Sequence, residues 1–246
     1  MDTPLFDYTL GLADDALVSA QRMGWWISRA PELEEDVALA NIGLDQLGQA
    51  RTLLTYAGVL EGAGRTDDDL AYLRDDREFR NVKLVERSMT DFGVAMARLL
   101  VFSTYQLHLY RALAASTDET LSAIAAKAVK EVAYHVDHAA HWVVRLGDGT
   151  DESHARMQAA LDAEWPYVDE LFAPVDASLV GRVADPAAIR DAVLTDVRRV
   201  VAQATLAAPE VAPALGGGRV GLHTEQLGFL LAGMQHLHRS HPGATW

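Results

Sequence analysis

The chain has 246 residues, of which half are hydrophobic and 23% charged, and its net charge is −14. This composition supports a sizeable core and argues against disorder. An acidic protein repels nucleic-acid phosphate and anionic lipid, so we expect no nucleic-acid and no membrane partner. The chain has no cysteine, which excludes disulfides, thiolate nucleophiles and Cys-ligated zinc or iron–sulfur sites.

The first residues lack the basic and apolar regions of a secretory signal, and no apolar stretch reaches the length of a transmembrane helix. We therefore expect a cytoplasmic protein. Abundant Ala and Leu, with few β-branched runs, favour helices. In chain order, the pattern predicts helices over about 8–28, 31–61, 91–114, 121–147, 151–172, 185–206 and 224–240, with a short helix within 69–90.

Several boundaries have specific signals. Pro31 is predicted to lie in the first turn of its helix, and Asp91 is a plausible N-cap. Gly147 is a typical C-terminal stop, and Thr224 is predicted to start the last helix. Pro166 is expected to kink the helix over 151–172.

The first four long helices form two pairs, with short connections inside each pair and a long one between them. This arrangement is typical of a ferritin-like four-helix bundle. We predict an all-α fold in one domain over 1–246, with a core bundle at about 8–147 and additional C-terminal helices at about 151–246. A solenoid is excluded because no repeat is visible.

Three histidines at a spacing of three, His135, His138 and His141, suggest a metal site. At 100° per residue they spread over about 120° of the helix surface, so they cannot converge on one ion. The apolar stripe places only His135 toward the core. Asp137 and His141 are expected to form a pair on the solvent-exposed face of the same helix. The stripe consists of Leu121, Ala125, Ala128, Val132, His135, Ala139, Trp142 and Leu146.

A ferritin-like di-metal centre needs a Glu on each of two helices and Glu-x-x-His on each of the other two. The third helix has no Asp or Glu between Phe92 and Ser116. The second helix carries Gln46 and Gln49 within its apolar stripe, and the fourth has Val132 three residues before His135. Neutral amides do not replace these ligands for iron or manganese. We therefore predict no metal and no cofactor in this chain.

The stretches "GWWISRAPELEEDVALANIGLDQLGQAR", "AKAVKEVAYH" and "GLHTEQLG" closely resemble the C subunits of bacterial ring 1,2-phenylacetyl-CoA epoxidases, and the resemblance extends over essentially the whole chain. It implies a non-catalytic, ferritin-like subunit in a complex whose A subunit holds the di-iron centre. It also implies that the former ligand positions are Ala16, Gln46, Gln49, Val132 and His135, of which only His135 could still bind metal.

Two acids adjoin these positions, Asp45 before Gln46 and Glu131 before Val132. In related di-iron proteins such acids orient ligand imidazoles. We predict that Asp45 hydrogen-bonds His135 and that Glu131 hydrogen-bonds Gln49, replacing the metal as a polar cross-link. The alternative is that Asp45 pairs with Arg51 or with a loop group.

Weaker signals remain. The "GGGR" segment could contact a coenzyme A phosphate through Arg219, although a flexible connection is the simpler interpretation. One of Trp25 and Trp26 is expected in the core, and the other could contact a partner. The charged run 74–80 is typical of a solvated surface.

The leading functional hypothesis is a structural subunit of a multicomponent monooxygenase for aerobic phenylacetate degradation, bound to the A subunit and to further subunits. One alternative is a free-standing enzyme with a mononuclear metal site around His135, Asp45 and Glu131. Another is a free-standing ferritin-like binding protein.

Overall fold

A computed structural model describes residues 2–244, and every regular element within them is a helix. The chain forms two compact units, Met1–Ser88 with Gly217–Trp246, and Met89–Gly216. The first unit contains α1 (Thr3–Gly24), α2 (Leu33–Glu61), α3 (Asp67–Tyr72), α4 (Lys83–Glu86) and α9 (Glu225–Ser240), with short 3-10 turns at Asp76–Glu78 and Gly218–Val220. The second contains α5 (Phe92–Leu113), α6 (Glu119–Gly147), α7 (Asp151–Glu164) and α8 (Pro186–Gln203), with 3-10 turns at Trp165–Tyr167, Asp169–Phe172 and Ala177–Leu179.

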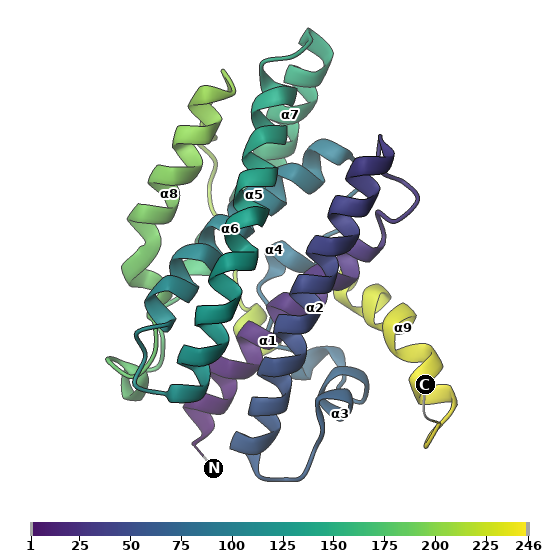
Figure 1. Cartoon of the computed structure of the whole chain (residues 1–246), viewed down its shortest axis with the longest axis vertical. Coiled ribbons are helices and arrows are strands. Elements are labelled where there is room, and N and C mark those ends of the chain that lie inside the picture. The colour runs from purple at the N-terminus through teal and green to yellow at the C-terminus, as the bar shows by residue number, and fades with distance from the viewer. Residues whose placement is uncertain (1, 245–246) are drawn as a thin grey trace. The chain divides into compact units, whose positions relative to one another are not determined.

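In the first unit, α1 and α2 lie side by side as a helix pair (Figure 1). The expected span of 8–28 for the first helix was wrong at both ends. Asp2 caps α1 by accepting a hydrogen bond from the Leu5 amide, and a proline in the first turn supports this early start. The helix ends at Gly24, and single turns follow it.

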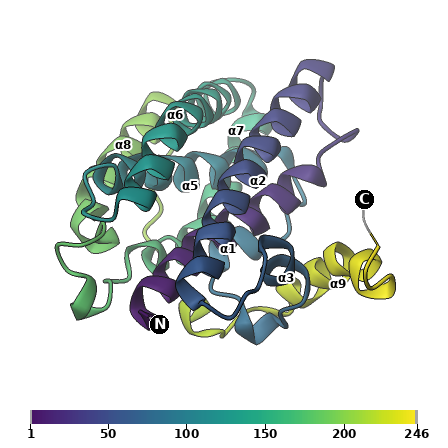
Figure 2. The same cartoon turned by 60° about the horizontal axis from the view of Figure 1, so that its bottom comes forward.

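The second helix starts later than expected. Glu32 is its N-cap, so Pro31 lies just before the helix instead of in its first turn. The helix ends at Glu61, as predicted. Gly62 follows in a left-handed conformation with φ of 71°, which stops the helix. The short α9 begins after Thr224, as predicted, and packs on α3 and α4 (Figure 2).

In the second unit, α5 and α6 form the other long helix pair. Asp91 caps α5 by accepting from the Gly93 amide, and α6 ends at Gly147, as predicted. Pro166 does more than kink the next helix. The α-helix stops at Glu164 and continues only as 3-10 turns, which corrects the expected span of 151–172.

The long pairs α1–α2 and α5–α6 give the all-α, ferritin-like fold that the sequence predicts. The predicted C-terminal extension is divided, because α7 and α8 belong to the second unit and α9 to the first. The description of 1–246 as one domain stays a prediction. In the part of the chain that is described, no helix is long and apolar enough to cross a membrane.

Candidate functional site

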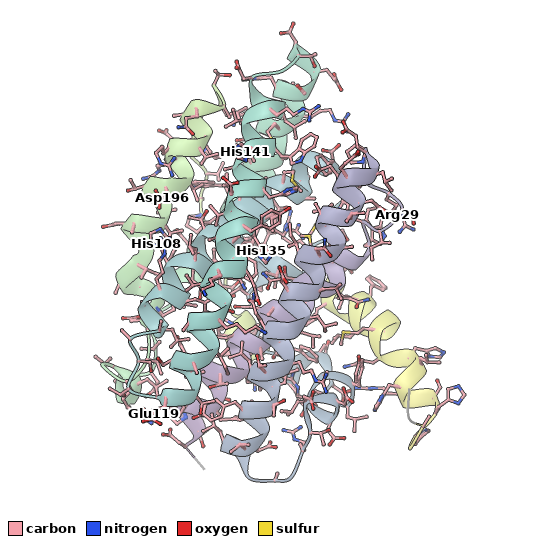
Figure 3. The ribbon with its side chains drawn as sticks, viewed as in Figure 1. Arg29, His108, Glu119, His135, His141 and Asp196 are labelled. Atoms are coloured by element: carbon pink, nitrogen blue, oxygen red, sulfur yellow. The ribbon has the colours of Figure 1, made fainter. Side chains whose placement is uncertain are left out.

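The three histidines of α6 lie as the helical pattern predicts. His135 is fully buried, His138 half-buried and His141 exposed. The Nδ1 atom of His141 lies 3.5 Å from Oδ2 of Asp137, which confirms the expected pair one turn apart. Figure 3 labels His135 and His141 on α6. The three side chains therefore do not form one site.

The buried stripe of α6 departs from the expected one near its C-terminal end. Trp142 and Leu146 are half-buried, and Val143 and Gly147 take their places in the core. A side chain at 147 would clash with the backbone of Ala204 on the segment after α8. The stripe therefore ends on a glycine because another backbone lies against it.

The five positions that the resemblance implies as former metal ligands are all buried. Ala16, Gln46, Val132 and His135 have no exposed surface, and Gln49 is 4% exposed. This set offers two amides and one imidazole but no carboxylate, so it does not fit a di-iron centre, which requires four carboxylates. Across residues 2–244, no three or more His, Asp or Glu side chains lie close enough together to hold a metal ion.

The two hydrogen bonds expected between these helices, Asp45 with His135 and Glu131 with Gln49, stay predictions. Two observations bear on the neighbouring charges. Arg51 Nε lies 3.2 Å from Oδ2 of Asp67, and Lys127 Nζ lies 3.8 Å from Oε1 of Glu131. Arg51, the alternative partner that we considered for Asp45, thus has an ion pair elsewhere.

The tryptophans divide as expected, with Trp26 buried and Trp25 46% exposed. The role of Trp25 in partner binding stays a prediction. Arg219, the candidate coenzyme A contact, directs its guanidinium inward. Its Nη1 donates to the backbone carbonyls of Gly11 and Arg80, and its Nη2 lies 2.6 Å from Asp15.

Arg219, whose side chain is 27% exposed, lies at the edge of a largely buried charge cluster in the first unit. The cluster consists of Asp14, Asp15, Arg74, Glu86, Arg219 and His223. Its members come from α1, from the segment 74–86 and from the segment that leads into α9. In charged form, three acids face two arginines and one histidine, so the cluster can reach neutrality by itself.

The first half of the cluster is centred on Asp14, which is fully buried. Its carboxylate accepts hydrogen bonds from both Nη atoms of Arg74, one of them at 2.9 Å, and from the backbone amide of Arg80 at 2.8 Å. Arg74 also lies over the ring of Phe79, 4.2 Å from its centroid. This two-point contact fixes the segment 74–80 against α1.

Asp15, the next residue of α1, faces a different partner. It accepts from the Val82 amide at 2.8 Å and from Arg219 at 2.6 Å. Burial raises the pKa of the Asp15 carboxyl to about 6, although Arg219 and the Val82 amide act to lower it. Gly11, one turn earlier, leaves the space that the Arg219 side chain occupies.

The protonation of His223 follows from its hydrogen bonds. Nε2 lies 3.0 Å from the carbonyl oxygen of Phe79, and Nδ1 lies 2.7 Å from Oε2 of Glu86. Both partners accept, so both ring nitrogens carry hydrogen when Glu86 is ionised. Burial acts to lower the pKa of His223, but these hydrogen bonds and the charge of Glu86 raise it overall.

Glu86 also accepts from the side chain of Asn81 at 2.8 Å and from the Thr224 amide at 2.6 Å. The carboxylate therefore binds the residue immediately before α9 as well as His223. We interpret the whole cluster as a polar anchor that joins three segments of the first unit, because its charged groups satisfy one another inside the protein.

Sequence reasoning missed this cluster and misread part of it. The run 74–80 was expected to be a solvated surface, yet Arg74 and Phe79 are buried. A signal was present in α1, where Asp14 and Asp15 interrupt an apolar sequence. Their partners could not be identified, because Arg74 is 60 residues and Arg219 is 204 residues away.

The second unit has its own buried ion pair. Arg98 Nε donates to Glu164 at 2.8 Å, and both side chains are almost fully buried. The partly exposed His108 and Asp196 also pair at 2.8 Å, between α5 and α8 (Figure 3). In the first unit, a cavity of about 390 Å³ beside α9 is lined by other residues, including Asp69, His238 and Arg239.

Comparisons with known proteins agree with the family resemblance of the sequence. A family model described as phenylacetic acid catabolic protein matches residues 1–246. The chain is 45% identical over 243 residues to the C subunit of the 1,2-phenylacetyl-CoA epoxidase of Escherichia coli (strain K12). This match covers 97% of the chain and 98% of that protein.

Proposed function

Because the chain belongs to the phenylacetic acid catabolic protein family, we propose that it is the structural, non-catalytic subunit of a phenylacetyl-CoA 1,2-epoxidase. In this role it binds the catalytic A subunit and further subunits, and it supports the assembly in the cytoplasm during aerobic phenylacetate degradation. The di-iron centre belongs to the A subunit.

One observation carries the non-catalytic role. The positions that the resemblance implies as former di-iron ligands are all buried, and they hold Ala16, Gln46, Gln49 and Val132, with His135 as the one imidazole. Without carboxylates, the site cannot offset the charge of two metal ions. The named relative supports the assignment to an epoxidase complex, because it is itself a subunit of such an enzyme.

Metal content tests this proposal. The chain would be purified alone and after co-expression with the A subunit from the same organism, and iron would be measured per subunit. We expect the chain alone to be free of iron, and iron and epoxidation of phenylacetyl-CoA to be found only in the co-purified complex. About one metal ion bound by the chain alone, and lost in His135→Ala, would instead support a mononuclear enzyme.

A matched variant makes the result specific. His141→Ala changes an exposed histidine of the same helix and controls for the loss of any imidazole. We expect neither His135→Ala nor His141→Ala to change the iron content of the complex. If His135→Ala alone removed iron from the complex, the assignment of all iron to the A subunit would be wrong.

A further inference from the structure

The long helix α2 carries two apolar stripes with the spacing of a helix–helix contact. The buried stripe contains Leu39, Ile42, Gln46, Gln49 and Leu53, at steps of three and four residues. A second stripe, which we call the outer seam, follows the same alternation. It contains Leu33, Val37, Ala40, Leu44 and Leu47.

The outer seam faces solvent. Leu33 is 75% exposed, Val37 54%, Leu44 64% and Leu47 45%, and Ala40 between them is half-buried. Steps of four and three over two heptads keep these side chains on one line along the helix, as in a coiled-coil seam. The seam is about 21 Å long, at 1.5 Å per residue. A contiguous exposed apolar surface of this kind typically marks an interface.

The charge around the outer seam limits its partner. Residues 30–50 contain Glu32, Glu34, Glu35, Asp36 and Asp45, and no Lys, Arg or His. A second copy in parallel orientation would set Glu32, Glu34 and Asp36 against the same three acids. Arg51, four residues beyond Leu47 on the same line of the helix and with its side chain 79% exposed, is already paired with Asp67. A partner with Lys or Arg beside an apolar stripe would instead be attracted.

We propose that the outer seam binds an amphipathic helix of the catalytic A subunit, with basic residues of that helix beside the acidic start of α2. This inference rests on the proposed function, because it names the surface through which the structural role would be exerted. A helix that buries its apolar stripe in the seam would leave its polar flanks over Glu32, Glu34 and Asp36.

The test measures the affinity of the purified chain for the purified A subunit by isothermal titration calorimetry. Leu44→Glu places a charge in the middle of the seam. Val59→Glu is the matched control, because Val59 is an exposed aliphatic residue on the same helix beyond the seam. We expect Leu44→Glu to weaken binding at least about 30-fold, equivalent to about 2 kcal/mol, and Val59→Glu to leave it within about 2-fold of wild type.

A charge reversal tests the second part of the inference. We expect Glu34→Lys to weaken binding at low salt and to reduce its dependence on ionic strength. Glu119→Lys is the control, since Glu119 is also exposed in the first turn of a long helix, α6 (Figure 3). It has the same unfavourable effect on the helix dipole and should leave binding unchanged.

The outcomes separate the two proposals. If wild type binds the A subunit and Leu44→Glu and Glu34→Lys bind equally well, the seam is not the interface and the proposed function stands. If wild type does not bind the A subunit at all, both proposals fail. If Leu44→Glu instead converts a dimer of this chain into a monomer, the occupant is a second copy and the inference is overturned.

Discussion

The contact between Asp14 and Arg74 allows a quantitative test of the buried charge cluster. Replacing Arg74 with Met keeps an unbranched apolar chain over Phe79 but removes the guanidinium. The fully buried Asp14 carboxylate would then keep only the Arg80 amide as a donor among the hydrogen bonds described above. Leaving one member of a buried ion pair without its partner typically costs about 3–5 kcal/mol.

The expected loss is large enough for ordinary unfolding experiments. For a chain of this length, each kcal/mol lowers Tm by about 2–4 °C, so Arg74→Met should lower it by roughly 6–20 °C. Arg51→Met is the control, because Arg51 is 79% exposed and pairs with Asp67 on the surface. It should cost less than about 1 kcal/mol. Calorimetry and urea unfolding would measure both variants.

A double-mutant cycle isolates the interaction. Asp14→Asn removes the charge of the acid and keeps its size, so a second change at Arg74 should then cost much less than it does in wild type. We expect a coupling energy of about 2–3 kcal/mol. Strict additivity, or a cost below about 1 kcal/mol for Arg74→Met, would refute the interpretation of this contact as an anchor.

Two further predictions concern the same unit. The raised pKa of His223 means that its stabilising charge is fully present below the unfolded value near 6.5 and is lost as pH rises through the folded value. Asp15 acts in the same direction, because burial raises its pKa from 3.8 to about 6 and so favours the protonated carboxyl in the folded protein. Its stabilising contribution is fully present below pH 3.8 and is lost as the pH rises through about 6. Tm should therefore fall between pH 5 and 8, and His223→Gln should flatten this fall; an unchanged profile in the variant would contradict the role of His223. Gly221→Ala should cost about 2–4 kcal/mol, because Gly221 has φ of 79° and lies against a neighbouring backbone carbonyl. Gly62→Ala, at φ of 71° with open space around it, should cost only about 1 kcal/mol in the same urea titration, and equal costs would show that the close approach is unimportant.

The helices were predictable because their boundaries have local causes. Asp91 and Gly147 mark helix ends through capping and a glycine stop, which depend on nearby residues. The start of α1 was missed, although Asp2 with a following proline is also a local signal. The change from Leu146 to Gly147 in the core could not be predicted, because the backbone of Ala204, 57 residues further along the chain, lies against Gly147.

The candidate site was predictable only where it depends on one helix. The spacing on α6 was sufficient to separate the buried His135 from the exposed His141. The absence of a carboxylate ligand set on α2 stays a prediction from its residue types. The partners of Asp14 and Asp15 depend on long-range packing, which no local pattern encodes.

Helix α1 carries both a predicted former ligand position and part of the anchor. Ala16, which the resemblance implies as a former ligand position, is buried, and the two preceding residues, Asp14 and Asp15, are buried acids. Their charge is balanced by Arg74 and Arg219, which come from segments of the same unit. Buried carboxylates need a cation nearby, and on this helix guanidinium groups meet that need.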